Sequence, residues 1–143
     1  MKHFLLLSFT VFVLTASAQE KPIFATKAGA IKGYDPVAYL KEGKPVKGDG
    51  EQKLEWKGAT WYFSSEENKN LFEANPEDYA PQYGGYCAYG VAKGGLYKIA
   101  PEAWKIVDGK LYLNYSFKFQ KEWEEDIPGY ITEANKNWPE LIK

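Results

Sequence analysis

The side chain best suited to chemistry in this sequence belongs to its one cysteine, Cys87. It lies in a segment rich in glycine and tyrosine, residues 81–90, shortly after Gly84 and Gly85. Two adjacent glycines can adopt positive φ angles, and such a turn can point successive backbone N–H groups at one atom. Donors of this kind would stabilise a thiolate, the form of cysteine that attacks electrophiles, is oxidised or binds metals. The alternative is that Cys87 is a small buried side chain that only packs.

The first 18 residues have the layout of a cleaved secretory signal peptide. Lys2 supplies a positive charge, and residues 4–14 are almost entirely apolar. Ala16-Ser17-Ala18 then offers a cleavage site, which makes Gln19 the first mature residue. The apolar stretch is shorter than the roughly 20 residues that a membrane span needs. We therefore expect an exported protein, periplasmic or secreted, with no membrane span after cleavage. An uncleaved N-terminal anchor is the alternative.

Cleavage would remove the only histidine, His3, and the only methionine, Met1, so that Cys87 would remain as the only sulfur. A chain without histidine cannot form a Ser-His-Asp triad or an HExxH zinc site. A single cysteine cannot form a disulfide within the chain, nor complete a zinc site of Cys and His ligands. These absences favour a binding module over an enzyme, and we assign no catalytic residue.

The charge of the chain argues against a nucleic-acid partner. The formal net charge is -1, and all 18 basic residues are lysines, because the sequence contains no arginine. Phosphate binding normally shows as clustered positive charge, and bidentate phosphate contacts are mainly made by arginine.

The elements that must position Cys87 follow from local signals. Asp35-Pro36 predicts a helix over 36–41, because Asp caps helices and Pro suits their first position. Asp108-Gly109 between apolar runs predicts a hairpin of strands 104–107 and 110–114. We also expect strands at 54–56 and 60–63, helices at 65–74, 76–79, 116–125 and 128–137, a loose lead-in over 19–30 and a loop over 81–95. Helices and short hairpins without a regular βαβ order predict a single α+β domain.

Six ordered segments carry a resemblance to a known family. They are residues 33–39, 43–48, 61–65, 81–88, 108–114 and 137–139. Together they are similar to the YHS domain proteins, and specifically to their small exported single-domain branch. The resemblance covers about residues 31–139, so we expect a YHS-like domain over 31–143, preceded by the signal peptide (1–18) and the lead-in (19–30).

The resemblance implies metal handling, because YHS domains are found attached to copper-transporting ATPases and heavy-metal proteins. Some members of the similar branch carry selenocysteine where this chain has Cys87, which would suit soft-metal binding or redox chemistry. On this interpretation the Cys87 thiolate binds a soft cation such as Cu(I), which prefers sulfur. One sulfur is not enough, so the coordination would be completed by Tyr83, Tyr86, Tyr89, a carboxylate or the second chain of a homodimer.

Two departures from the family pattern bear on that metal site. After cleavage the chain has no histidine, so a Cys-plus-His site cannot be carried over. Ala100-Pro101 stands where the family pattern would have Asp-Pro, which removes one carboxylate before the final hairpin.

Two other functions stay open. A thiol-redox protein would cycle Cys87 with an external thiol, because the chain has no second cysteine to resolve the oxidised form. Alternatively, a chain with 11 Tyr and five Trp could be an interaction or ligand-binding domain with a tyrosine-rich face. The metal and redox hypotheses both require a partly accessible Cys87 with a pKa below the free value of about 8.5.

Overall fold

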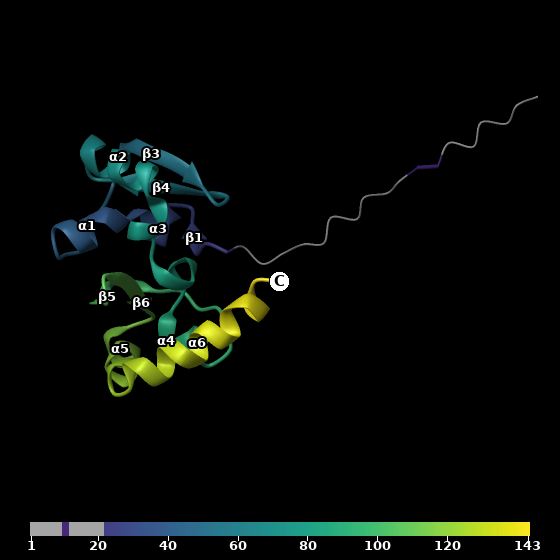
Figure 1. Ribbon diagram of the computed structural model, residues 1–143. Helices are drawn as coiled ribbons and strands as arrows, with labels where there is room; N and C mark the ends of the chain where they lie inside the picture. The colour runs from purple at the N-terminus through teal and green to yellow at the C-terminus, as the bar shows by residue number, and fades with distance from the viewer. Residues whose placement is uncertain (1–9, 12–21) are drawn as a thin grey trace, which may run out of the picture.

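Figure 1 shows the computed structural model of the chain, which describes residues 10–11 and 22–143. The predicted cleavage site and most of the predicted signal peptide lie outside the described residues. In the described part, no helix is both long and apolar enough to cross a membrane. That part combines short helices with two-stranded antiparallel sheets, which confirms the α+β fold class.

The upper half of the molecule in Figure 1 contains the hairpin of β3 and β4 and three short helices. Its elements are α1 (Pro36–Lys41), β3 (Asp49–Trp56), β4 (Ala59–Phe63), α2 (Glu66–Ala74) and α3 (Pro76–Tyr79). The hairpin turns at Lys57 and Gly58, whose φ angles of 49° and 76° suit a two-residue turn. It is the predicted hairpin, with a longer first strand than the sequence pattern indicated.

Asp35, the fully buried N-cap residue of α1, forms hydrogen bonds that join α1 to α2. Its Oδ1 accepts hydrogen bonds from the backbone N–H groups of Val37 at 2.8 Å and Ala38 at 3.3 Å. Its Oδ2 accepts from Ser64 N, Ser64 Oγ and Asn68 Nδ2, each at 2.8 Å. The predicted Asp-Pro helix start is confirmed, and the same carboxylate also joins α1 to α2. Such a dense set of donors offsets the cost of burying a carboxylate.

The lower half carries the second hairpin and the C-terminal helices (Figure 1). Its elements are α4 (Ala88–Ala92), β5 (Ala100–Val107), β6 (Lys110–Asn114), α5 (Phe117–Glu124) and α6 (Ile127–Leu141). Asp108 and Gly109 have φ angles of 50° and 76°, so the predicted turn between apolar strands is confirmed.

Strand β6 lies between two hydrophobic clusters. Leu111 and Leu113 belong to the cluster that contains Trp61, Phe63 and Phe72 of the upper half. The intervening Tyr112 belongs to the other cluster, with Trp123 of α5 and Ala134 of α6. Because successive side chains of a strand point to opposite faces, one strand can serve both clusters.

Residues 22–30 are not the loose lead-in that we expected. β1 (Ala25–Thr26) pairs with β2 (Gly29–Ala30), and a 3₁₀ turn, η1 (Ile31–Gly33), follows. Ile23 and Ala30 are buried, and the Phe24 N–H donates to the Gly84 carbonyl at 2.9 Å. Strands of two residues are too short to show an alternating pattern in the sequence, which is why this segment was missed.

Two further expectations need correction. The segment 81–95, expected to be a loop, contains the 3₁₀ turn η2 (Gln82–Gly85) and helix α4. The last helix, expected to end near residue 137, continues through Pro139 to Leu141. Trp138 and Leu141 pack against the cluster of Trp123, so tertiary burial outweighs the local cost of a proline near the helix end.

Candidate functional site

Cys87 is the N-cap residue of α4 and is buried, with 1% of its surface exposed. Its backbone N–H donates to the Tyr97 carbonyl at 3.0 Å, so the chain after α4 folds back over the cysteine. Its carbonyl accepts from the N–H of Val91 at 2.9 Å, which begins the helix. The thiol is therefore fixed at the start of a short helix.

The sulfur of Cys87 makes three hydrogen bonds. It accepts hydrogen bonds from the backbone N–H groups of Gly90 at 3.4 Å and Tyr115 at 3.2 Å. Its own proton is directed to Asn114 Oδ1, 3.6 Å away. Burial raises the pKa of the Cys87 thiol above its ordinary value, although the N–H groups of Gly90, Tyr115 and Tyr89 oppose that shift. The group is thus a neutral thiol near pH 7, whereas the metal and redox hypotheses call for a lowered pKa.

Asn114, the last residue of β6, is fully buried behind the thiol. Its Oδ1 also accepts from the Tyr89 N–H at 3.0 Å, so one amide oxygen serves both Cys87 and the first turn of α4. Among the described residues, Asn114 Nδ2 has no hydrogen-bond partner. A buried polar group usually has a role in positioning its neighbours, because its desolvation is costly.

A cavity of about 400 Å³ lies against the thiol. Its lining consists of Cys87, Tyr89, Gly90, Lys93, Tyr97, Tyr115 and Phe119. The Phe119 ring packs at centroid distances of 5.2 Å from Tyr89 and 5.7 Å from Tyr115. Tyr97 and Tyr115 are exposed and lie at the mouth, so the cavity opens to solvent. Its size is within the range of small-ligand pockets, about 300–1,000 Å³.

One wall of the cavity depends on residue 90 being glycine, which has no side chain. A Cβ atom at Gly90 would lie 2.5 Å from Cδ2 of the Tyr97 ring. The ring of Tyr97 can therefore lie against the backbone of α4 only because residue 90 is glycine. Gly90 also donates its N–H to the sulfur, so it both holds the thiol and makes room for an aromatic wall.

Gly84 and Gly85 have positive φ angles of 62° and 85°, as the sequence led us to expect. Their N–H groups, however, are not the donors to the sulfur; Gly90 and Tyr115 are. A Cβ at Gly84 would overlap the Pro22 carbonyl, and one at Gly85 would lie 2.5 Å from Cγ2 of Ile31. The two glycines thus allow the N-terminal segment to pack closely against η2.

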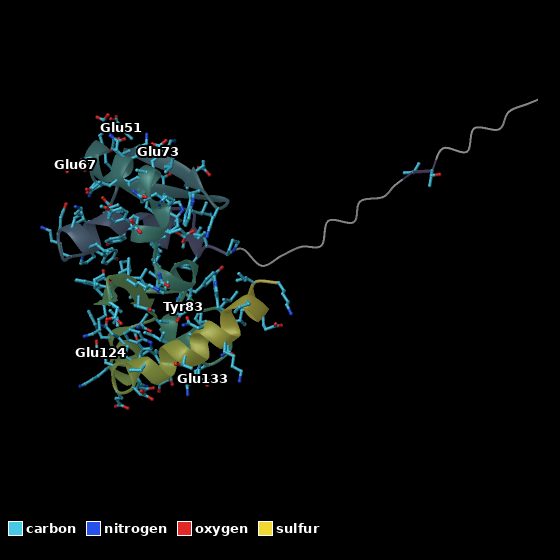
Figure 2. The ribbon with its side chains drawn as sticks, viewed as in Figure 1. Glu51, Glu67, Glu73, Tyr83, Glu124 and Glu133 are labelled. Carbon is cyan, nitrogen blue, oxygen red and sulfur yellow. The ribbon has the colours of Figure 1, made fainter. Side chains whose placement is uncertain are left out.

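The three predicted tyrosine ligands occupy different places. Tyr89 lines the cavity with Cys87, but Tyr83 and Tyr86 are not among its lining residues. The Tyr83 hydroxyl donates to Asn135 Oδ1 at 2.9 Å, and its burial raises its pKa. Figure 2 shows Tyr83 in the middle of the molecule, between the two halves, whereas the labelled glutamates lie at the outer surface. Tyr86 packs its ring against Phe24 and Trp138.

Comparison with protein families gives one match, and it covers residues 37–83 of this chain. The matching family is the YHS domain. The chain contains a YHS domain. Neither a curated protein nor a solved structure matches the chain significantly.

The matched part of the YHS domain holds most of α1, both strands of the first hairpin, α2 and α3, and it ends at Tyr83. Cys87 and every other residue that lines the cavity follow the matched segment in the sequence. The family match therefore identifies the framework of the upper half, while the candidate site is built by the residues after it.

The residues around Cys87 are a poor donor set for the soft metal that the YHS resemblance implies. Within residues 10–11 and 22–143, no group of three or more His, Cys, Asp or Glu side chains could hold a metal ion. The cavity offers one sulfur, phenol rings and the ammonium group of Lys93. Cu(I) prefers several soft ligands, so the donors present in one chain do not fit it.

Sequence reasoning missed most of the cavity. It singled out Cys87 and Tyr89, but not Lys93, Tyr97, Tyr115 or Phe119, which follow in the loop after α4 and around the start of α5. It also assigned no role to Asn114. A polar residue at the end of the apolar strand 110–114 was the one available signal, because a buried amide must bond to something.

Proposed function

We propose that this protein is a binding module that holds a small planar ligand in the Cys87 cavity. The observation that carries the proposal is the lining: four aromatic rings surround a cavity of about 400 Å³ with a sulfur atom at its inner end. Aromatic walls favour flat, apolar ligands by stacking and by burial of apolar surface. A neutral thiol adds a polarisable contact that is favourable beside aromatic rings.

The state of the thiol supports binding over redox chemistry. Cys87 is 1% exposed, and its burial raises its pKa, so the thiolate that would attack an external disulfide or peroxide is scarce near neutral pH. An external thiol partner would also have to reach a sulfur at the base of a cavity. In a binding module the same burial is no obstacle, because the ligand enters the cavity and contacts the sulfur from within.

Binding of the neutral two-ring probe 2-naphthylmethanol tests the proposal. We expect the amide NMR signals of Cys87, Gly90, Tyr97 and Phe119 to shift on titration. Phe119→Ala, which removes a wall, should weaken binding by about tenfold, since a well-packed ring contributes on the order of 1.5 kcal/mol. Phe117→Ala is the matched control, because Phe117 is 68% exposed and does not line the cavity. Equal effects of the two variants, or no shift at these residues, would overturn the proposal.

Soft-metal binding at the same sulfur is a second candidate, favoured by one observation. Two backbone N–H groups point at Cys87 Sγ, and such donors would stabilise a metal-bound thiolate. Burial of the sulfur counts against a site shared by the two chains of a homodimer, because two buried sulfurs cannot approach one ion. Anaerobic titration with Cu(I) against a competing chelator tests this candidate. Binding of Cu(I) by the native protein that is lost in Cys87→Ser would support copper handling.

We also propose export, on the N-terminal pattern of Lys2, the apolar stretch 4–14 and Ala16-Ser17-Ala18. Mass spectrometry of protein recovered from outside the cytoplasm should give an N-terminus at Gln19. Recovery with Met1 intact would contradict cleavage.

A further inference from the structure

Three lysines lie close to the aromatic rings that line the cavity. Lys93 lines it directly, with its Nζ 5.5 Å from the ring centroid of Tyr89 and 5.6 Å from that of Tyr130. Lys98 Nζ lies 5.6 Å from the Tyr115 ring, and Lys118 Nζ lies 5.8 Å from the Phe119 ring. All three side chains are exposed, and in the described part of the chain none of them forms an ion pair with a carboxylate.

One carboxylate, that of Glu122, acts on the Tyr89 ring of this cavity. The carboxylate of Glu122 raises the pKa of the Tyr89 hydroxyl, which places this negative charge near the ring. Among the residues that line the cavity, Lys93 is the one that carries a charge near pH 7. The three ammonium groups of Lys93, Lys98 and Lys118 outnumber the carboxylate of Glu122, so the charge beside these rings is positive on balance, although the whole chain has a formal net charge of -1.

From this arrangement we infer that the ligand of the Cys87 cavity is a planar anion, such as an aromatic carboxylate, whose rings lie between the aromatic walls and whose negative group pairs with Lys93. The inference rests on the proposed function and specifies the class of ligand. A lysine without an ion-pair partner gains attraction from an incoming carboxylate, and the apolar walls lower the local dielectric and strengthen it.

The alternative is that the rings form an aromatic cage for a cation. Aromatic faces attract cations, and cages of this kind recognise quaternary ammonium groups. Here, however, the rings of Tyr89, Tyr115 and Phe119 each already have a lysine ammonium over them. A cationic ligand would have to enter beside these charges, which repel it, so the charge pattern selects the anion.

Three probes with the same two-ring system separate these cases: 2-naphthoate, 2-naphthylmethanol and 2-naphthyltrimethylammonium. Titration calorimetry of the whole protein at low ionic strength should show the carboxylate binding about tenfold more tightly than the alcohol, a difference of about 1.4 kcal/mol that a partly desolvated ion pair supplies. Added salt should reduce this ratio, since screening weakens exposed charge pairs.

Substitution of the lysine identifies its role. Lys93→Gln should bring the ratio of carboxylate to alcohol affinity close to one and leave the affinity for the alcohol nearly unchanged. Lys110→Gln is the control, because Lys110 lies at the turn end of β6, away from the Asn114 end that contacts the thiol. That variant should keep the tenfold ratio.

The outcomes distinguish this inference from the proposed function. If the alcohol binds in the cavity as tightly as the carboxylate, or the ammonium probe binds most tightly, the anion inference is overturned while the binding module stands. If Lys93→Gln weakens the alcohol and the carboxylate equally, the lysine serves the fold and the inference also fails. If none of the three probes binds, the proposed function falls and this inference falls with it.

Discussion

Cys87 and Asn114 form a buried pair in which the thiol sulfur lies 3.6 Å from the amide oxygen Oδ1. That oxygen also accepts the backbone N–H of Tyr89 at 3.0 Å. The amide thus holds the thiol proton and the first turn of α4 at the same time, and it joins the end of β6 to the start of the helix. Asn114 therefore helps to fix the position of the sulfur, together with the N–H groups of Gly90 and Tyr115.

Asn114→Ala should therefore destabilise the protein by about 2–4 kcal/mol, because it leaves the half-buried Tyr89 N–H and the buried thiol without their acceptor. Urea denaturation measures the free energy of unfolding. Asn135→Ala is the control, since the exposed Asn135 only accepts the Tyr83 hydroxyl, and its loss should cost about 1 kcal/mol. Equal losses in the two variants would mean that the buried amide has no special role.

Native Cys87 should react slowly with iodoacetamide at pH 7, by a factor of about 100 or more relative to the urea-unfolded chain. The reason is that burial raises the pKa of the thiol, so the reactive thiolate is scarce near pH 7. Labelling followed by mass spectrometry gives the rate. Native labelling as fast as that of the unfolded chain would revive the redox hypothesis.

Stability should decrease at alkaline pH. Burial raises the pKa values of Tyr39, Tyr83 and Cys87 in the folded protein. The folded state then binds more protons than the unfolded state once the pH exceeds about 8.5 for cysteine and about 10 for tyrosine. Their contribution to stability is complete below those values and is lost as the pH rises above them, at up to about 1.4 kcal/mol per pH unit for each group.

Urea denaturation, repeated at intervals of about half a pH unit between pH 8 and pH 11, measures how the free energy of unfolding changes with pH. Tyr39→Phe should lower the stability near pH 8, because it removes the 2.8 Å hydrogen bond to the Pro101 carbonyl, but it should flatten the alkaline slope. An unchanged slope in that variant would show that Tyr39 does not contribute to the pH dependence.

Gly84→Ala should be much more destabilising than Gly94→Ala. Both glycines have positive φ angles, 62° and 89°, and the strain of an L-residue there costs about 1–2 kcal/mol at either site. At Gly84 the new Cβ would also overlap the Pro22 carbonyl, whereas nothing lies within 4 Å of one at Gly94. We expect Gly84→Ala to lower the free energy of unfolding by about 3 kcal/mol or more, and Gly94→Ala by about 1 kcal/mol. Similar losses in the two variants would mean that the segment around Pro22 can move away from the new Cβ atom without a loss of stability.

Asp35→Ala should destabilise the domain by about 3 kcal/mol or more, because five hydrogen bonds to its carboxylate are lost and several of their donors stay buried. Asp126→Ala is the matched control: Asp126 caps α6 through a single exposed hydrogen bond to Gly129 N. A cap of that kind contributes about 1 kcal/mol. If the two losses are alike, Asp35 acts only as a helix cap.

The features that could be predicted from the sequence are those set by neighbouring residues. Asp35-Pro36 determines a helix start and Asp108-Gly109 determines a turn, because their backbone preferences act within a few residues. The cavity could not be predicted, since Tyr89, Tyr97 and Phe119 come together only when α4, the following loop and α5 pack against β6. The burial of Ile23 likewise depends on contacts with residues far along the chain.

The position of β6 between the two clusters has a consequence for how the protein unfolds. Leu111 and Leu113 pack with the upper half, and Tyr112 packs with Trp123 of the lower half, so neither cluster can separate from β6 without exposing apolar side chains of the strand. We therefore expect the two halves to unfold as one cooperative unit, without the family-matched segment persisting alone. Cleavage sites for a protease should therefore become accessible in both halves at the same time.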